Sequence, residues 1–321
     1  MNDNKHKYIE FCKEQALPLH MQPWWLDAVC VEGHWGVALS FDGLGHINGV
    51  LPYYMPDSFW LRTIRMPPFS DYAGIWLRIS DTPGMKPERC YDIEMRIISA
   101  LCDQLPRVAF YDQSLFPDFD NWLPFYWQGY RQTTRYTYVL PPGAGKEVLY
   151  GSFRSSLKKD LRKAESRVVI TQSDSPEDFY RVYERSFAKQ NMAPAQSLQN
   201  LLRMDAAAAA HHCRRIYLAR DGENGALHAG LYVVWDDHQA YLLLSGADPA
   251  LRASGALFLL QWQAIQDFTT KGLQVDFCGS VLPKVENALR AFGAERKEYY
   301  RIYKAGNRFW RLLALLLNKD Y

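Results

Sequence analysis

The stretch from Ala240 to Arg301 carries the pattern that decides the fold. It opens on an apolar run, Ala240-Tyr-Leu-Leu-Leu-Ser-Gly246, and a polar turn, Arg252-Ala-Ser-Gly255, follows a few residues later. The turn leads into a periodic segment from Ala256 to Lys271, and a second apolar run, Leu273-Gln-Val-Asp-Phe-Cys278, comes next. This order predicts a buried strand, a loop, an amphipathic helix and a second buried strand.

The segment from 256 to 271 is predicted to be helical because its apolar residues recur at helical spacing and Gly272 follows its end. These apolar residues are Leu257, Leu260, Ala264, Ile265 and Phe268. The flanking runs are apolar almost throughout, which is typical of strands covered on both faces. A helical crossover between such strands favours parallel pairing. We therefore expect an α/β fold with mixed sheets flanked by helices.

The polar turn is a candidate binding site for a phosphate group. A turn that feeds a helix N-terminus presents unpaired backbone N–H groups and the positive end of the helix dipole. Both features favour an anion. The candidate residues are Arg252, Ala253, Ser254, Gly255 and Ala256.

Four short segments resemble the GNAT acyltransferase superfamily, and more narrowly its tandem group that includes the Fem-type peptidoglycan aminoacyltransferases. They are Arg252-x-x-Gly255-Ala256, Gln261-Trp-Gln-Ala-Ile265, Val275-Asp-Phe-Cys-Gly-Ser280 and Arg290-Ala-Phe-Gly-Ala-Glu295. The resemblance implies that the loop at residues 252–256 cradles the pyrophosphate of an acyl-coenzyme A. It also implies two GNAT-like domains in tandem, each a mixed antiparallel and parallel sheet flanked by helices.

The first half of the chain repeats this order more weakly. Residues 35–41 and 46–55 flank a glycine-containing turn and predict a hairpin, and residues 59–66 are expected to form a third strand. A helix from Pro87 to about Leu105 and a strand at 107–111 follow. The two halves are therefore interpreted as a degenerate duplication.

Length supports two domains, because 321 residues are close to twice a typical domain. The segment from Pro141 to Gly145 is the best linker. We expect a degenerate N-terminal GNAT-like domain at 1–140 and a C-terminal GNAT-like domain with the donor site at 146–321.

Composition and charge limit the classes of protein that remain. The chain is 48% hydrophobic and 22% charged, which suits a folded protein with a sizeable core. A net charge of +2 is too balanced to indicate DNA as a partner. No apolar run reaches the roughly 18 to 20 residues of a membrane-spanning helix. Residues 1–7 are polar without a following apolar segment, so we expect a cytoplasmic protein.

Metal binding and disulfide bonds are not expected. The six cysteines have no CxxC spacing, which suits reduced thiols. The run His211-His212-Cys213 would point adjacent side chains about 100° apart on a helix, and no second pair has the spacing of a zinc site.

Acyl transfer to an amine needs a neutral nucleophile, donors for the developing oxyanion and a proton source for the leaving group. Asp276 is the candidate base, because it lies near the carboxyl end of a buried strand, where an open sheet forms its crevice. The alternative is that Asp276 only caps the loop at Gly279-Ser280. Ser280 and Glu286 follow closely and are candidates for orienting the acceptor.

A proton donor is sought on the last predicted strand, at residues 298–303, which holds Tyr299, Tyr300 and Tyr303. Strand alternation sends Tyr300 to the face opposite the other two. The GNAT resemblance implies that a tyrosine protonates the departing thiolate, and Tyr300 is the candidate.

A basic segment from Phe153 to Arg167 has an apolar stripe at every fourth residue and is predicted to be a helix with cationic flanks. The stripe is Phe153, Leu157 and Leu161. Arg154 and Lys158 are candidates for meeting the phosphates of a large donor or acceptor. The alternative is a solvated helix face, partly neutralised by Asp160 and Glu165.

A polar and aromatic loop at Pro67–Gly74 is a candidate acceptor site, because a long loop between strands needs a reason to be ordered. Asp71 and Tyr72 are its candidate residues. The resemblance supports this candidate as well, because related tandem proteins carry a comparable Pro-Pro-Phe loop. The segment from Asn307 to Leu317 is expected to be a docked C-terminal helix, with a membrane-surface helix as the alternative.

Three functions remain open. The first is an N-acyltransferase that moves an acyl group from an acyl-coenzyme A to an amine, either a small molecule or a cell-envelope precursor, bound between the two domains. The second is a Fem-type transferase that takes its amino acid from aminoacyl-tRNA and acts on a peptidoglycan precursor. The long helical arm common in such enzymes has no counterpart in the sequence, which counts against tRNA. The third is a non-catalytic GNAT-derived binding protein.

Overall fold

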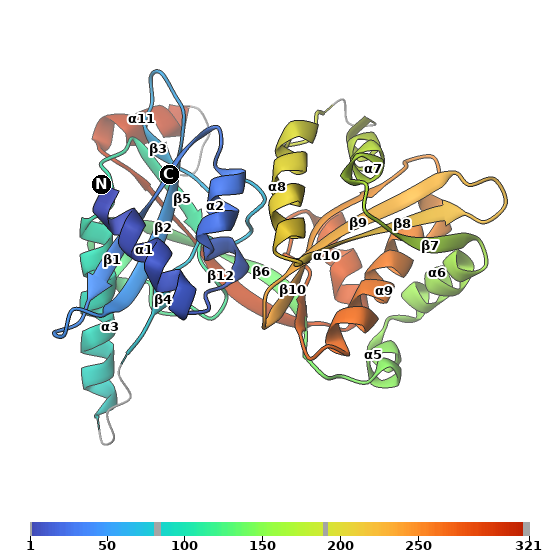
Figure 1. Ribbon diagram of the computed structural model, residues 1–321, viewed down its shortest axis with the longest axis horizontal. Helices are drawn as coiled ribbons and strands as arrows, with labels where there is room; N and C mark the ends of the chain where they lie inside the picture. The colour runs from blue at the N-terminus through green and yellow to red at the C-terminus, as the bar shows by residue number, and fades with distance from the viewer. Residues whose placement is uncertain (1, 80–84, 189–191, 317–321) are drawn as a thin grey trace. The chain divides into compact units, whose positions relative to one another are not determined.

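The chain folds as two units of mixed α/β structure, drawn in Figure 1. The computed structural model describes residues 2–79, 85–188 and 192–316. The first unit combines residues 1–135 with residues 298–321, and the second consists of residues 136–297. The predicted fold class is confirmed, while the domain limits predicted from the sequence stay a prediction.

The first unit holds two sheets and a helix-rich N-terminus. Its elements are α1 (Asn2–Glu14), α2 (Pro23–Val29), β1 (Gly33–Phe41), β2 (Ile47–Pro56), β3 (Thr63–Ile64), β4 (Trp76–Leu77), α3 (Pro87–Asp103), β5 (Phe110–Ser114), α4 (Leu123–Trp127), most of β12 (Glu295–Ala305) and α11 (Arg308–Leu316). Strands β1, β2 and β4 pair antiparallel, whereas β5 pairs parallel with β3 and antiparallel with β12. The predicted hairpin is confirmed as β1 and β2, and the predicted helix is confirmed as α3, which buries Ile98 and Leu101 in the core of this unit.

The strand expected over 59–66 is much shorter than predicted. Only Thr63 and Ile64 pair as β3, while Phe59 and Trp60 lie in a turn and are almost fully exposed. In that turn the Ser58 hydroxyl oxygen accepts a hydrogen bond from the Leu61 N–H at 3.1 Å. The strand expected at 107–111 is β5, shifted towards the C-terminus.

The C-terminal helix α11 is docked on the first unit along one side, as expected. The Trp310 ring packs edge-to-face on Phe110 with 5.9 Å between ring centroids. Leu317, the last residue of the predicted helix, lies outside the described residues. Within the described residues, no helix has both the length and the apolar character needed to cross a bilayer.

The second unit is built on one mixed sheet with strand order β6-β11-β10-β9-β8-β7. Its elements are β6 (Arg131–Leu140), α5 (Lys146–Ser152), α6 (Ser155–Glu165), β7 (Val168–Ser173), α7 (Pro176–Ala188), α8 (Leu198–Ala210), β8 (Arg214–Asp221), β9 (Leu227–Trp235), β10 (Gln239–Ala247), α9 (Ala256–Thr269), β11 (Gln274–Asp276) and α10 (Pro283–Leu289). All neighbours in this sheet pair antiparallel except β10 and β11.

The β-loop-α-β unit predicted from the sequence is confirmed as β10, α9 and β11. Strands β10 and β11 are parallel neighbours, and α9 covers one face of the sheet. Helix α9 buries Leu260, Ile265 and Phe268 in a core that also takes Leu157 and Leu161 from α6. The apolar stripe predicted for the basic segment is therefore a packing stripe.

Helix α7 covers the opposite face of the sheet at close range. A Cβ atom added at Gly246 of β10 would lie 2.6 Å from the Cα atom of Tyr183 in α7. Because only glycine leaves this space open, the helix can lie directly on the strand. The C-terminal half of β10 is thus held in place by its contact with α7.

Strands β10 and β11 part soon after they meet. Their register covers three pairs, from Gln239 opposite Gln274 to Tyr241 opposite Asp276. Strand β10 then passes an irregularity in its pairing with β9 and continues to Ala247. Beyond the last pair, Leu243 and Leu244 are half-buried and Ser245 is exposed, although β10 is a central strand of the sheet. The sheet therefore opens between two parallel neighbours.

Candidate donor and transfer site

The loop predicted to bind phosphate forms the entry to α9. Arg252–Ser254 make one turn of 3₁₀ helix, and Gly255 then takes a left-handed conformation with φ of 76°. The Ser254 hydroxyl oxygen accepts a hydrogen bond from the Ala256 N–H at 3.3 Å. Arg252 and Ala253 are exposed, whereas Ser254, Gly255 and Ala256 are buried.

Two backbone donors at the start of α9 are available to an anion. Among the described residues, neither the Leu257 N–H nor the Phe258 N–H has a hydrogen-bond acceptor, whereas the Leu259 N–H donates to the Gly255 carbonyl. These donors lie at the positive end of a 14-residue helix. The loop therefore combines free N–H groups, a helix dipole and the exposed Arg252 guanidinium, which together suit a phosphate.

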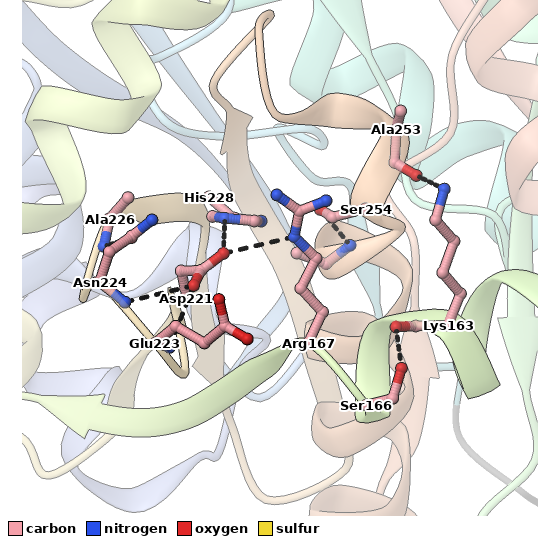
Figure 2. Close-up of polar contacts among 11 residues, drawn as sticks. Lys163, Ser166, Arg167, Asp221, Glu223, Asn224, Ala226, His228, Ala253 and Ser254 are labelled. Atoms are coloured by element: carbon pink, nitrogen blue, oxygen red, sulfur yellow. Dashed lines mark hydrogen bonds and ion pairs between the residues drawn. The ribbon is translucent and has the colours of Figure 1, made fainter.

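The basic helix α6 lies against this loop. A Cβ atom added at Gly255 would lie 2.8 Å from the Asp160 carbonyl oxygen. Lys163 donates a hydrogen bond to the Ala253 carbonyl at 2.6 Å, as Figure 2 shows. The structure thus joins two features that the sequence presents far apart, the basic segment and the donor loop.

We expect Gly255→Ala to destabilise the protein more than Gly272→Ala. Both glycines have positive φ, which costs an alanine about 1–2 kcal/mol, but space is open at Gly272 and closed at Gly255. The loss in free energy of unfolding at Gly255 should exceed that at Gly272 by at least about 1 kcal/mol, because the new methyl group meets backbone. Urea unfolding measures both. Equal losses would contradict the close contact between the loop and α6.

A second polar cluster, drawn in Figure 2, lies where β8 ends and β9 begins. The Asp221 carboxylate accepts hydrogen bonds from the Glu223 N–H at 3.1 Å and from Arg167 Nε at 3.3 Å, and it lies 3.2 Å from His228 Nε2. The hydrogen bond from the Glu223 N–H lowers the pKa of Asp221, burial opposes this shift, and Arg167 adds to it. The sequence analysis missed this cluster, and only the turn Asp221-Gly222 signalled its position. Asp221 is committed to several donors, so it serves to fix the turn.

Asp276 is completely buried at the end of β11 and joins three strands. Its carboxylate accepts hydrogen bonds from the Thr137 hydroxyl of β6 and from Gln239 Nε2 of β10, the latter at 2.9 Å. It also accepts from the Cys278 N–H at 2.7 Å, next to a backbone with φ of 60° at Cys278. This geometry suits the alternative in which Asp276 fixes the loop. Its assignment as a general base stays a prediction.

We expect Asp276→Asn to lower the free energy of unfolding by about 1–3 kcal/mol, because an amide N–H₂ would face groups that themselves donate hydrogen bonds. Asp237→Asn is the matched control, since Asp237 is exposed in the turn before β10. Denaturant unfolding without any substrate measures both changes. A variant at Asp276 as stable as the wild type would contradict a structural role.

The first turns of α10 form a polar edge that the sequence analysis identified in part. Glu286 accepts a short hydrogen bond of 2.5 Å from the Tyr138 hydroxyl and pairs with Arg290 at 3.2 Å. Burial and then the Glu286 carboxylate raise the pKa of Tyr138. Ser280 caps the preceding turn by accepting from the Leu282 N–H at 3.1 Å. A phenol bound to a carboxylate in this way can pass a proton, and Tyr138 was missed because its partner lies far away in the sequence.

The two basic candidates at the start of the second unit contact backbone and amide groups. Arg154 Nη1 donates to Asn287 Oδ1 at 3.2 Å, next to Glu286. Lys158 donates to the Gly151 carbonyl at 2.9 Å and lies over the Tyr150 ring. Arg154 therefore lies beside α10, while Lys158 closes the turn between α5 and α6.

The remaining candidates belong to the first unit. Tyr72 is fully buried and packs against Phe116 and Tyr299 with 5.2 Å between ring centroids in each case. Asp71, beside it in the same loop, is half-buried. Tyr300 is half-buried against the core of the unit, and burial, followed by Glu298 and Asp120, raises its pKa. The structure thus groups Asp276, Ser280 and Glu286 with the donor loop in one unit and leaves Tyr300, Asp71 and Tyr72 in the other.

Metal-ligating side chains do not gather in the described part of the chain. No three His, Cys, Asp or Glu side chains there lie close enough to hold an ion. The site consists instead of backbone donors, cationic side chains and a hydrogen-bonded phenol.

Comparison with known proteins agrees with this architecture. Residues 151–295 match the family model described as an acetyltransferase (GNAT) domain. Residues 151–295 therefore form a GNAT domain. A search of curated protein sequences finds no significant match.

Solved structures share the fold at low sequence identity. The crystal structure of FemX aligns with a TM-score of 0.67 at 11% identity and covers 98% of both chains. The C-terminal domain of a putative lysylphosphatidylglycerol synthetase from Agrobacterium fabrum aligns with a TM-score of 0.52 at 13% identity, covering 98% of this chain and 95% of that one. L-PGS from Bacillus licheniformis aligns with a TM-score of 0.50 at 10% identity, covering 98% and 97%. At these identities the likeness shows the fold alone.

Proposed function

We propose that this protein is an N-acyltransferase that takes an acyl group from an acyl-coenzyme A-type thioester and transfers it to an amine. The observation that carries the proposal is the parting of β10 and β11 in the same unit as the free N–H groups of α9. The match of residues 151–295 to a GNAT acetyltransferase domain supports it.

The donor loop offers the groups that a pyrophosphate needs. The Leu257 and Phe258 N–H groups and the Arg252 guanidinium would bind its oxygens. Beyond Tyr241, β11 no longer pairs with β10. The backbone of β10 can therefore bind an extended amide chain in the position that an added strand would take. A pantetheine arm, which is such a chain, would then run along residues 242–247.

The reaction requires a neutral amine to attack the thioester carbonyl, so that a C–N bond forms and the C–S bond breaks. The proton lost by the amine nitrogen balances the proton gained by the thiolate. We propose that Tyr138, hydrogen-bonded to Glu286, belongs to the proton path, because it is a phenol of raised pKa beside α10. Asp276 as base and Tyr300 as acid remain predictions.

The alternative donor is an aminoacyl-tRNA, as in Fem-type enzymes, with a cell-envelope precursor as acceptor. The chain shares its fold with FemX over 98% of both chains, which is compatible with this alternative. One feature counts against it: among the described residues of the second unit, no helix is longer than the 14 residues of α9. The long helical arm expected of a tRNA-dependent member therefore has no counterpart there.

A non-catalytic binding protein is the third candidate. Such a protein would be expected to have a misformed donor groove. The open edge of β10 and the free donors of α9 argue for a groove that retains its function.

Coenzyme A should raise the melting temperature of the wild-type protein, because a ligand bound only by the native state stabilises it. In Arg252→Glu the shift should vanish, with binding weakened at least about tenfold by loss of a charged hydrogen bond. Arg203→Glu is the matched control, since Arg203 is exposed on α8, which packs on α7. A full shift in Arg252→Glu would contradict the donor loop.

The donor is identified by mixing the protein with a panel of primary amines and either acetyl-coenzyme A or an aminoacyl-tRNA. We expect an N-acylated amine and free coenzyme A thiol from the thioester, detected by mass spectrometry and a thiol reagent. Product formed only from aminoacyl-tRNA would favour the Fem-type alternative. Coenzyme A binding without any product from either donor would favour the binding protein.

A further inference from the structure

One end of the first unit exposes large apolar side chains on two separate elements. In the turn between β2 and β3, Phe59 is 89% exposed and Trp60 is 87% exposed. On α11, Phe309, Leu312 and Leu316 are between 59% and 74% exposed. Single exposed apolar residues need no explanation, but a group of five does.

The two elements meet at the same small cluster. Leu61, next to the exposed turn, and Trp310 of α11 both pack on the cluster formed by Ala109 and Phe110. Figure 1 shows α11 close to the end of the first unit where β3 lies. We call the exposed residues Phe59, Trp60, Phe309, Leu312 and Leu316 the apolar rim.

Helix α11 has a second apolar face that its docking does not use. Trp310 packs on the cluster of Ala109 and Phe110, and Leu313, about 60° from it round the helix, is half-buried as well. At about 100° per residue, Phe309, Leu312 and Leu316 fall within about 60° of one another on a different side. An ordinary surface helix turns its apolar face to the core and leaves polar residues outside. Here the outward face is apolar as well.

Two arginines border this outward face. Arg308 and Arg311 are exposed, and neither has an acidic partner among the described residues. On the helix Arg308 lies about 40° from Leu312, and Arg311 lies about 60° further round, so both are on the side opposite the docked residues. Apolar side chains flanked by arginines are complementary to a lipid surface, where the rings enter the interface and the guanidinium groups meet lipid phosphates.

The turn at Phe59-Trp60 fits the same surface. The two rings contact edge-to-face with 4.8 Å between centroids, so they form one aromatic wedge at the tip of the turn. Tryptophan and other amphipathic rings favour the boundary between water and hydrocarbon. Binding to a protein partner would require a groove that fits the wedge, whereas insertion into an anionic lipid surface requires no matching shape.

We propose that the apolar rim, with Arg308 and Arg311, is a docking surface for the face of a membrane that contains anionic phospholipid. The aromatic wedge and the outward face of α11 insert to shallow depth, and the arginines bind headgroup phosphates. The inference does not depend on the donor loop or on catalysis, since all its residues belong to the first unit.

The test is co-sedimentation of the full chain with vesicles of phosphatidylcholine, with and without phosphatidylglycerol. We expect the wild type to sediment with phosphatidylglycerol vesicles and much less with phosphatidylcholine alone. The double variant Phe59→Ser/Trp60→Ser should partition at least about tenfold less, because it loses two inserting rings. The partitioning of Phe309→Ser/Leu312→Ser should fall similarly. Because the two double variants change different elements, the test still stands if one of them fails to fold.

Matched controls separate insertion from general apolar exposure and from charge. Leu44→Ser removes an apolar side chain that is 83% exposed in another turn of the same unit, and its partitioning should equal that of the wild type. Arg308→Glu/Arg311→Glu should lose at least about tenfold on phosphatidylglycerol vesicles, while Arg203→Glu should not.

Three results would overturn the proposal. The first is a wild-type protein that does not sediment with phosphatidylglycerol vesicles. The second is equal sedimentation of Phe59→Ser/Trp60→Ser and the wild type. The third is a concentration-dependent dimer in sedimentation velocity that the same substitutions abolish, since the rim would then be an interface between two copies of the chain.

Discussion

The opening in the sheet of the second unit, on which the proposed function rests, depends on how briefly β10 and β11 remain paired. Three residue pairs join them, and the Asp276 carboxylate binds Gln239 of β10 and Thr137 of β6 at that point. Beyond it, β10 keeps its place because it stays paired with β9 and because α7 lies on Gly246. Because β11 no longer pairs with β10 there, β10 has an open backbone edge inside a folded unit. Unpaired backbone groups of this kind are costly unless a ligand or water satisfies them.

Local pattern was enough to predict the elements that surround this opening. The apolar spacing of α9, its closing glycine and the two apolar strands specify a β-loop-α-β unit within 40 residues, and Gly255 has the positive φ that its turn needs. The partners of Asp276 could not be predicted in this way. Thr137 lies 139 residues away in the sequence, and Tyr138 is 148 residues from Glu286. Periodicity describes a residue's own element and says nothing of which distant strand lies beside it.

Aromatic residues show a second limit of sequence patterns. Phe59 and Trp60 have high strand propensity, so residues 59–66 were expected to be a strand, yet both rings lie exposed in a turn. Strand propensity reflects a preference of these side chains for a half-buried pleated surface. The sequence alone does not distinguish such a strand from a solvent-exposed turn with the same residues. On α11, likewise, the apolar residues exceed what one docked face can bury, and the pattern could not say which of them would remain outside.

The cationic residues of the basic helix α6 do not all need to contact a ligand in order to influence the loop beside it. Two of its lysines donate to main-chain carbonyls, Lys158 to Gly151 and Lys163 to Ala253. These bonds fix the helix against the donor loop, and Asp160 lies where only Gly255 leaves room. Their charges still raise the local potential, because a lysine bound to a neutral carbonyl keeps its full charge. In the proposed function, attraction of an anion to the loop would come from α6, whereas its orientation would come from the donors of α9 and from Arg252. This division of roles lies between the two interpretations of the basic segment, a solvated face and a phosphate site.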